Sequence, residues 1–204
     1  DTFISTCFDV DTFIYAKKNN SLFVWGDRLR GQSGGGDLKS SSTDAEGTNS
    51  GAFFLDHSRG ATVDFSGGHL ASAPAATGNS YVRYFFRRAP GFFDVVAYTG
   101  TGSLTGVNHN LGVEPELKII KRRSATSDWV VGGSAVAGEN GYIYLNSTAA
   151  QVSSTGYWDG GDDSATQFSV RNTNSASDAS GSYYIAYLFA TLDGISKVGS
   201  YTGT

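Results

Sequence analysis

The sequence predicts an all-β protein built from two tandem antiparallel β-sandwich domains of the same fold. No window of a dozen residues carries a helical stripe of apolar side chains free of glycine. The apolar segments are short, rich in β-branched and aromatic residues, and separated by clusters of glycine, serine, asparagine and aspartate, a pattern typical of strands and turns. The chain also repeats itself at the length of a domain, as arrays formed by duplication do.

The repeat consists of two aligned blocks. Residues 81–101 lie over residues 184–204 at an offset of 103 positions, without a gap. Residues 36–65 lie over residues 141–170 at an offset of 105 positions. The difference of two residues falls in the Gly/Ser/Ala-rich residues 66–80, where a loop would absorb it. We therefore predict two tandem copies of one module, and the first strand of a third copy at the end of the chain.

Short apolar runs place the same series of strands in both modules, and this strand density is typical of an antiparallel β-sandwich. In the second module we expect strands over residues 94–98, 104–109, 116–123, 128–132, 142–145, 156–159, 166–171 and 182–190. In the first module we expect them over residues 12–18, 22–26, 37–40, 52–55, 62–66 and 80–88.

These matches set the expected domain boundaries. Residues 1–92 form the first repeat, which is divergent and incomplete at its N-terminus, residues 93–192 form the second, and residues 193–204 begin a third. The joints Ala89-Pro90-Gly91 and Leu192-Asp193-Gly194 are short, so we expect successive modules to be held close rather than tethered flexibly. The chain opens on aspartate and lacks methionine, and we expect it to be a segment of a longer protein.

The closing strand of each module predicts which side chains form the core. Side chains alternate across a strand, so every second residue shares a face. One face is apolar in both modules and is expected to point inward: Val82, Tyr84, Phe86, Ile185, Tyr187 and Phe189. The opposite face carries Tyr81, Arg83, Phe85 and Arg87 in the first module, and Tyr184, Ala186, Leu188 and Ala190 in the second. Arginines are seldom buried unpaired, so we expect the first of these opposite faces to meet water. The second must be covered by a loop of its own module, or by a neighbouring module or subunit.

A series of motifs runs through the second module in order. The members are Tyr98-Thr99-Gly100-Thr101-Gly102, the turn His109-Asn110-Leu111-Gly112-Val113-Glu114-Pro115, the apolar residues 117–123, Asp128-Trp129-Val130-Val131, Leu145-Asn146-Ser147-Thr148 and Tyr184-Ile185-Ala186-Tyr187-Leu188-Phe189-Ala190. As a set, this series resembles the tandem modules of tail-fibre-like and appendage proteins of marine bacteriophages, cyanophages especially. The resemblance covers all of the second module. The first module is a divergent copy, with Thr6-Cys7-Phe8-Asp9-Val10 where the turn would be. The resemblance implies a structural or adhesion component of a virion and no known chemistry.

Composition argues against several classes of function. The net charge of -4 argues against a nucleic-acid partner. No apolar run approaches the roughly 20 residues that a membrane-spanning helix needs, so we expect no membrane insertion. Cys7 is the single cysteine, so the fold does not depend on an internal disulfide.

No catalytic, cofactor-binding or metal-binding residue is predicted. Gly31-Gln32-Ser33-Gly34-Gly35 matches G-x-S-x-G, but nothing helical follows it, whereas a nucleophile elbow needs a strand before the serine and a helix after it. His57, His69 and His109 occupy unrelated positions without the spacing of zinc ligands. We expect His109 to bond the backbone and fix its turn rather than to act as a base.

One loop, Asp159-Gly160-Gly161-Asp162-Asp163, concentrates carboxylates on a glycine-rich segment. Calcium binds about six to eight oxygen ligands on flexible backbone, and this loop could supply some of them. The corresponding positions of the first module lack the acids. A solvated acidic loop and a calcium site both remain open.

The tryptophans and the basic clusters also allow two interpretations each. Trp25, Trp129 and Trp158 lie in apolar runs, which favours core packing, although aromatic faces also stack on sugar rings. The basic clusters are expected to shield sheet edges from unwanted pairing, with anion binding as the alternative. They are Lys17-Lys18, Arg87-Arg88 and Lys121-Arg122-Arg123.

Together these observations predict a structural and display module of a phage virion, in a tail fibre, appendage or surface attachment protein, with a spacing or host-adhesion role. The expected partners are other virion proteins and copies of the chain itself, because repeated weak faces favour homo-oligomers, and a trimer is expected by analogy with fibres. The alternative is a carbohydrate-binding module that recognises host surface glycans through loops on a rigid scaffold. A glycan depolymerase would need two carboxylates about 5 to 10 Å apart, and no acid pair stands out in both modules, so no enzyme is predicted.

Overall fold

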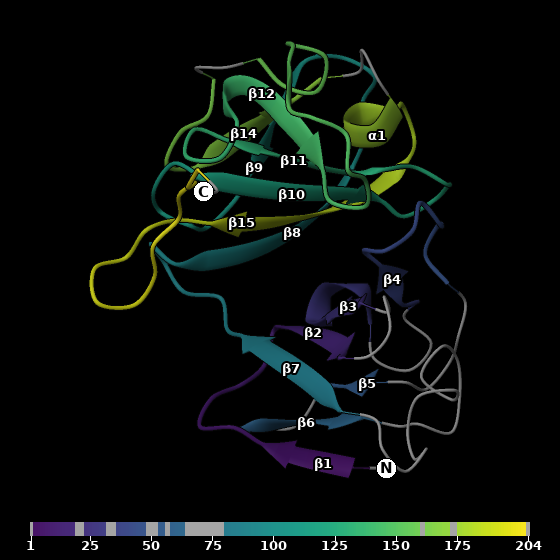
Figure 1. Ribbon diagram of the computed structural model, residues 1–204, viewed down its shortest axis with the longest axis vertical. Coiled ribbons are helices and arrows are strands. Elements are labelled where there is room, and N and C mark those ends of the chain that lie inside the picture. The colour runs from purple at the N-terminus through teal and green to yellow at the C-terminus, as the bar shows by residue number, and fades with distance from the viewer. Residues whose placement is uncertain are drawn as a thin grey trace. The chain divides into compact units, whose positions relative to one another are not determined.

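The computed structural model describes residues 2–18, 23–31, 36–47, 53–55, 58–63, 80–159, 162–171 and 175–202 (Figure 1). Within these ranges nearly all regular structure is strand, and every ladder between strands is antiparallel. The helical elements described there are one 3-10 turn, η1 (Arg28–Arg30), and one turn of α-helix, α1 (Ser175–Asp178). The predicted all-β class is therefore confirmed.

The chain divides into two compact units, unit 1 (Asp1–Arg87) and unit 2 (Arg88–Thr204). Unit 2 contains a six-stranded sheet in the order β13-β12-β11-β10-β15-β8 and a two-stranded sheet, β14-β9. Figure 1 shows β11, β10, β15 and β8 side by side in the larger sheet. The strands are β8 (Phe93–Thr99), β9 (Thr105–Asn108), β10 (Leu117–Arg122), β11 (Trp129–Gly133), β12 (Gly138–Tyr144), β13 (Val152–Ser153), β14 (Gln167–Val170) and β15 (Tyr183–Phe189).

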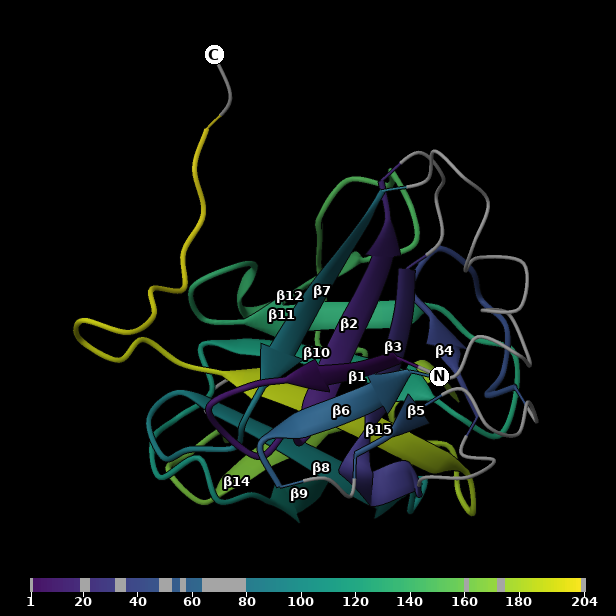
Figure 2. The ribbon, with the colours of Figure 1, turned by 90° about the horizontal axis from the view of Figure 1, so that it is seen from below.

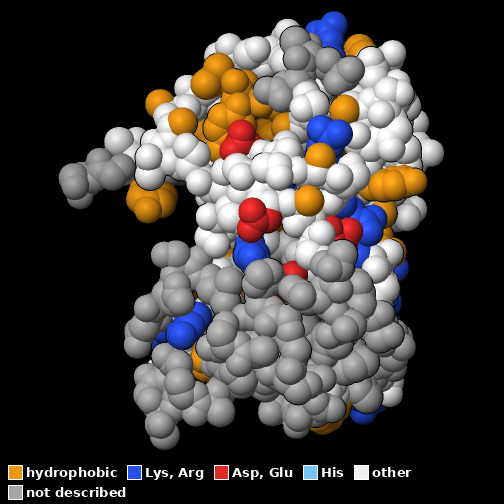
Figure 3. All heavy atoms as spheres, turned by 90° about the vertical axis from the view of Figure 1, so that its right-hand side faces the viewer, with side chains coloured by type: hydrophobic (Ala, Val, Ile, Leu, Met, Phe, Trp, Pro, Cys, Tyr) orange, Lys and Arg blue, Asp and Glu red, His pale blue; other side chains and the backbone are white. Residues whose placement is uncertain are grey.

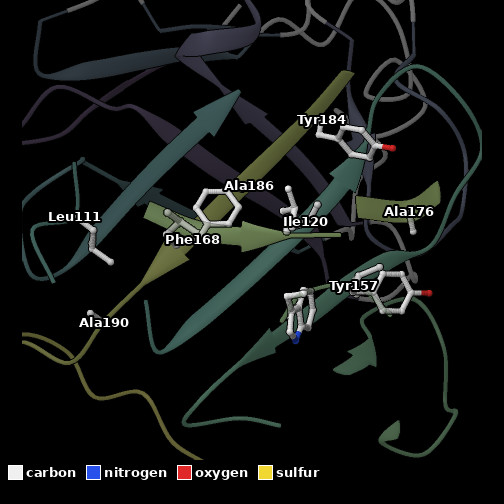
Figure 4. Packing of buried hydrophobic residues seen from close by; sticks show 12 residues of the cluster. Leu111, Ile120, Tyr157, Phe168, Ala176, Tyr184, Ala186 and Ala190 are labelled. Atoms are coloured by element: carbon white, nitrogen blue, oxygen red, sulfur yellow. The ribbon is translucent and has the colours of Figure 1, made fainter. Parts of the chain in front are cut away.

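One face of the six-stranded sheet packs against β14 and β9 and forms the core of unit 2 (Figure 4). The core residues are Leu111, Ile120, Val130, Tyr157, Trp158, Phe168, Val170, Ala176, Tyr184, Ala186, Leu188 and Ala190. The residues predicted as a strand at 156–159 form none. There the indole of Trp158 reaches β12, donating from Nε1 to the carbonyl oxygen of Gly141 at 3.2 Å. The short strand β13 supplies the backbone pairing with β12 instead.

Unit 1 contains a four-stranded sheet, β4-β3-β2-β7, and a three-stranded sheet, β1-β6-β5. A smaller core of Val10, Phe13, Tyr15, Val24, Leu55 and Ala61 holds it together. The strands are β1 (Thr2–Ser5), β2 (Thr12–Lys17), β3 (Phe23–Asp27), β4 (Leu38–Lys39), β5 (Phe53–Phe54), β6 (Gly60–Val63) and β7 (Tyr81–Phe86).

The two units share one fold, because their ladders have the same registers. The β2–β7 ladder begins with Thr12 opposite Phe86. The offset of 105 relates Thr12 to Leu117, and the offset of 103 relates Phe86 to Phe189. Leu117 and Phe189 are the pair with which the β10–β15 ladder begins. The β1–β6 ladder maps in the same way onto the β9–β14 ladder at an offset of 105. β8 has no counterpart among the described residues of unit 1, where β7 therefore lies at the edge of its sheet.

The predicted orientation of the closing strand is wrong in unit 1. Val82 and Tyr84 of β7 are exposed, whereas Tyr81 and Phe85 pack against the core. The reason lies in the register, since Phe85 stands directly opposite Phe13 of β2, and residues opposite each other in a ladder share a face. Arg83 lies on this inward side with its guanidinium carbon 5.6 Å from the centre of the Tyr15 ring.

In unit 2 both faces of the closing strand are buried. Tyr184, Ala186, Leu188 and Ala190 belong to the core cluster, in which β14 and neighbouring segments of their own unit cover them. The interpretation that this face is covered within its own module is therefore the correct one. Ile185 and Tyr187 on the other face are fully buried as well.

Candidate functional site

The two joints are the first candidate site, because they set how one repeat follows another. At the first joint the Ala89 and Phe93 backbones bond each other, and Gly91 adopts a φ of 74°. At the second joint Leu192 and Ser196 bond in the same pattern, and Gly194 adopts a φ of 76°. Each joint therefore contains the same tight turn, with glycine at the position that needs a left-handed backbone.

Residues 196–202 follow the second turn as β8 follows the first, yet they form no strand among the described residues. In Figure 2 this C-terminal segment, in yellow, runs out beyond the strands. Its start is held by a hydrogen bond from the Val198 backbone N–H to Thr191 Oγ1, and Thr191 in turn donates from both its N–H and Oγ1 to Glu116 Oε2. The first strand of a third repeat remains a prediction.

The turn motif at 109–115 is fixed by its histidine, as expected. His109 Nδ1 accepts a hydrogen bond from the Leu111 N–H at 3.1 Å, and Nε2 lies 3.2 Å from the Ser164 carbonyl oxygen, to which it can donate. The Leu111 carbonyl accepts from the Gly91 N–H of the first joint at 2.6 Å. Both ring nitrogens of His109 thus face backbone groups, and the turn that it fixes also supports the joint.

The opening motif at 98–102 encloses a buried carboxylate. Asp178 of α1 is almost fully buried and accepts hydrogen bonds from the backbone N–H groups of Thr101 and Ser103 and from Thr101 Oγ1, at 2.8 to 3.1 Å. Gly100 allows this approach, because a Cβ there would lie 2.3 Å from the Ala179 carbonyl oxygen. The carboxylate therefore anchors the loop that follows β8, and its oxygens accept hydrogen bonds from the protein's own donors.

Tyr98, the first residue of this motif, joins the same network. Its hydroxyl donates to the Ser177 carbonyl oxygen at 2.6 Å, and its ring stacks on Tyr184 with the centroids 5.1 Å apart. Burial raises the pKa of the Tyr98 hydroxyl well above its ordinary value, and the neighbouring Tyr184 and Asp178 add to that shift. The group therefore stays protonated and serves as a hydrogen-bond donor.

The acidic loop supplies ion pairs to its own unit. Asp163 Oδ2 lies 2.5 Å from the ammonium of Lys118, and Asp163 Oδ1 accepts from the N–H and hydroxyl of Ser169. Asp159 lies 3.4 Å from Arg171. Asp163 therefore has protein partners on both carboxylate oxygens. Among the described residues, which do not include 160 and 161, no group of three or more His, Cys, Asp and Glu side chains could hold a metal ion.

Lys118 was not singled out from the sequence, although it is a buried cation of unit 2. Its side chain is 2% exposed, and its ammonium lies 4.8 Å from the centre of a Trp158 ring as well as against Asp163. Burial lowers the pKa of Lys118, and the charge and hydrogen bond of Asp163 oppose that shift. Lys118 shares a face of its strand with Ile120 and Arg122, and its place beside the apolar Ile120 was a weak signal of burial. Its partner Asp163 lies far along the sequence, so the ion pair itself gave no signal.

All three tryptophans are buried, and Trp158 belongs to the core cluster of unit 2. Trp129 and Trp158 are fully buried, and Trp25 is nearly so. Trp25 Nε1 donates to Ser40 Oγ at 3.0 Å, and Trp129 stacks on Tyr187 with the ring centroids 6.5 Å apart. Burial is therefore confirmed for all three rings, and packing in a core cluster for Trp158.

The expected role of the basic clusters fails for the members that lie on inner strands of a sheet. Lys17 belongs to β2, which lies between β3 and β7, and Lys121 and Arg122 belong to β10. Lys121 is fully buried, and its ammonium donates to the Ser127 carbonyl oxygen at 2.5 Å. β10 lies between β11 and β15, so Lys121 cannot shield a sheet edge. Arg87 and Arg88, in contrast, are exposed and directly follow the edge strand β7.

A buried arginine in unit 1, Arg30, was also not expected from the sequence. Arg30 of η1 bonds Asp27 Oδ2 at 2.6 Å, Glu46 Oε1 at 3.0 Å and the carbonyl oxygens of Gly36 and Trp25. This network ties η1 to the segment that follows it. Ser33, His57 and His69 lie outside the described residues.

The space-filling view adds that charges of both signs are scattered over the described part of the face that it shows (Figure 3). None of the described helices is long and apolar enough to cross a membrane.

Comparison with known proteins identifies a family for unit 2. No curated protein and no solved structure matches the chain. The model of one family, described as a domain of unknown function (DUF7483), matches residues 93–204, which is more than half of the chain. The chain therefore belongs to the DUF7483 family.

Proposed function

We propose that this chain is a structural, non-enzymatic repeat of an extended assembly, and specifically a spacing or display module in the tail fibre, appendage or surface attachment protein of a phage virion. One observation carries the structural part of the proposal: two units with the same strand registers end in the same joint turn. Repetition of a rigid unit with a fixed turn lengthens a protein in equal steps. The virion part rests on the resemblance of the ordered motifs in residues 98–190.

The polar groups of those motifs support a structural role over a chemical one. The hydrogen-bonding atoms of these side chains bond backbone groups or other partners within unit 2, as His109, Asp178 and Asp163 show. A catalytic base or nucleophile needs at least one atom within reach of a substrate. These contacts support roles of the motifs in turn geometry and loop anchoring.

The partners follow from the same proposal. Copies of the chain and other virion proteins would surround each repeat, and three-fold assembly is proposed by analogy with fibres. Host-surface glycan binding stays the alternative for adhesion, but the three tryptophans that could have stacked on sugars are buried.

Immunogold electron microscopy of particles that carry the full-length gene product tests this function. We expect label on fibres, appendages or another surface attachment of the virion, repeated along its length. A compact monomer with no filamentous or particle-bound form would refute the proposal. Binding to a glycan array that is lost on substitution of an exposed loop aromatic would favour the alternative.

A further inference from the structure

Lys118 and Asp163 bring an amine and a carboxyl group into direct contact inside unit 2. Nζ of Lys118 lies 2.5 Å from Oδ2 of Asp163, and Cγ of Asp163 is one covalent bond beyond that oxygen. The lysine comes from β10 of the six-stranded sheet, whereas the aspartate precedes β14 of the two-stranded sheet. A bond between these two side chains would therefore join the two sheets of the unit.

The surroundings of Lys118 favour the amine over the ammonium ion. The lysine side chain is 2% exposed, and the ring of the buried Trp158 lies 4.8 Å from Nζ. Burial lowers the pKa of Lys118 and so raises the share of the neutral amine, although the charge and hydrogen bond of Asp163 oppose that shift. A desolvated neutral amine is the nucleophilic form of lysine.

The surroundings of Asp163 favour attack on its carboxyl carbon. Oδ1 accepts hydrogen bonds from the backbone N–H of Ser169 at 2.8 Å and from the Ser169 hydroxyl at 3.2 Å. The hydroxyl also lies 3.1 Å from the carbonyl oxygen of Asp159, so the N–H is the fixed donor of the two. Donors held at a carbonyl oxygen stabilise the negative charge that develops there when a nucleophile adds.

We propose that unit 2 forms an internal amide bond between Nζ of Lys118 and Cγ of Asp163, by condensation of the ion pair after folding. A proton first passes from Nζ to Oδ2, which gives an amine and a carboxylic acid. The nitrogen lone pair then adds to Cγ, and the electron pair of the C=O bond moves onto Oδ1, beside the N–H of Ser169. The Cγ–Oδ2 bond breaks as a second proton passes from Nζ to Oδ2, and one water molecule leaves.

The reaction balances without a further reactant. An ammonium ion and a carboxylate give one secondary amide and one water, with no change of oxidation state. Burial of Lys118 keeps bulk water from the amide, which disfavours hydrolysis. The Asp163 side chain is 13% exposed, so the product water can leave on that side.

We expect the condensation to be slow, because the protons pass within the pair alone. Glu114 acts on Lys118 through its charge and not through a hydrogen bond. None of the hydrogen bonds that the pair makes with described residues comes from a second acid. A freshly prepared chain should therefore hold the ion pair, in which the removal of either charge acts as an electrostatic change, and an aged chain should hold the amide.

Unit 1 has no counterpart of this linkage, because Phe13 occupies the ladder position of Lys118. The expected change is therefore the loss of a single water from the chain. The inference goes beyond the proposed structural role and does not depend on it.

Intact-mass spectrometry of the purified 204-residue chain, repeated over several weeks, tests the inference. The mass should fall by one water, and trypsin should release a branched peptide in which Lys118 is joined to Asp163 and is no longer a cleavage site. The urea midpoint should rise in step, because a cross-link across 45 positions restricts the unfolded chain. Chain kept unfolded in concentrated urea should retain its full mass, since the pair exists only in the folded unit.

Substitutions identify the two reacting groups. Lys118→Met removes the nucleophile and Asp163→Ser removes the carboxyl group, so each variant should retain its full mass whether or not it folds. Lys39→Met is the matched control, because it removes the cation of the exposed pair with Asp44. It should lose one water at the rate of the unchanged chain.

Three outcomes would overturn the inference: a full mass after several weeks, a branched peptide at another pair, or loss of water from Lys118→Met. The last would assign the lost water to a succinimide at an Asp-Gly pair such as Asp193-Gly194. Each leaves the virion proposal standing, and absence of the protein from particles would leave a measured amide bond standing.

Discussion

Removal of the negative charge beside Lys118 should destabilise unit 2 strongly. In Asp163→Asn the ammonium of Lys118, which is 2% exposed, keeps the Trp158 ring but loses its counter-charge. Breaking a buried ion pair by removing one partner typically costs about 3 to 5 kcal/mol. The Asp163 side chain is 13% exposed, so water reaches the site from that side, and we expect a loss near the lower end, about 3 kcal/mol.

The opposite substitution should cost less. Lys118→Met removes the cation, but Asp163 keeps the hydrogen bonds from Ser169 and its partial exposure. The double variant Lys118→Met/Asp163→Asn should recover most of the loss, because no buried charge remains. The two substitutions are therefore expected to be strongly non-additive, as contacting residues in one network are.

Urea unfolding followed by tryptophan fluorescence measures this effect. All variants carry Trp25→Phe, so that the signal comes from Trp129 and Trp158 of unit 2. A loss of about 3 kcal/mol lowers the urea midpoint by at least about 1 M for a typical dependence on denaturant. Asp44→Ala, which removes the exposed partner of Lys39, is the matched control and should leave the midpoint unchanged.

The pH dependence supplies a second check on the same variant. Burial lowers the pKa of Lys118, and loss of Asp163 should lower it further. The window lies between the folded-state pKa of Lys118 in the variant and that in the unchanged chain. There the folded variant has released a proton that its unfolded state still binds, so the stability of the variant relative to the unchanged chain should rise with pH. An Asp163→Asn midpoint equal to that of the Asp44→Ala control, or a deficit that grows with pH, would refute the reasoning.

Three further predictions follow from unit 2. Gly100→Ala should destabilise it by about 1 to 3 kcal/mol, because the new methyl group would press on a backbone carbonyl, whereas Gly199→Ala, with nothing within 4 Å, should be silent in thermal unfolding. Stability should fall as pH rises above 10, because burial raises the pKa of Tyr98 and Tyr184 and the folded state then holds protons that the unfolded chain has released; a midpoint constant from pH 9 to 11 would contradict this. Addition of a calcium chelator should leave the melting temperature unchanged, since the acid at the end of the 159–163 loop already has protein partners, and a lower value would restore the calcium interpretation.

The sequence was sufficient for the all-β class and for the repeat, because both depend on patterns that extend over many residues. Internal duplication gave more than a fold class, since the offsets of 103 and 105 are the offsets that relate the ladders of the two units. The repeated joint was also visible, as Gly91 and Gly194 align and both adopt a positive φ.

The side-chain environment was harder to predict, for identifiable reasons. Alternation tells which residues of β7 share a face but not which face is inside, and both faces of this strand contain aromatic residues. Arg83 favoured the wrong choice, because its cation lies near the Tyr15 ring rather than in open water. Lys118 was missed because its partner lies 45 positions away, a distance over which sequence gives no sign of contact.

Comparison of the two ladders also shows a difference in how the two units fill equivalent space. Phe13 and Lys118 occupy the same ladder position, and each stands opposite a glycine, Gly26 and Gly132. A Cβ on either glycine would collide with an aromatic ring, that of Phe13 itself in unit 1 and that of Trp158 in unit 2, at 2.2 and 1.9 Å.

In both units an aromatic ring therefore occupies the space over a glycine of the ladder, but the ring comes from a different segment in each unit. In unit 1 the ring comes from the strand residue opposite the glycine. In unit 2 that residue is a lysine, and the ring comes from the irregular segment after β13, where it also lies against the ammonium of Lys118. Trp158 and the Lys118–Asp163 pair are therefore one arrangement: the lysine is tolerated at a core position because the indole fills the volume that a phenylalanine fills in the other repeat. This arrangement accounts for Asp163 in unit 2, since unit 1, with Phe13 at the position of Lys118, has no cation at that position to neutralise.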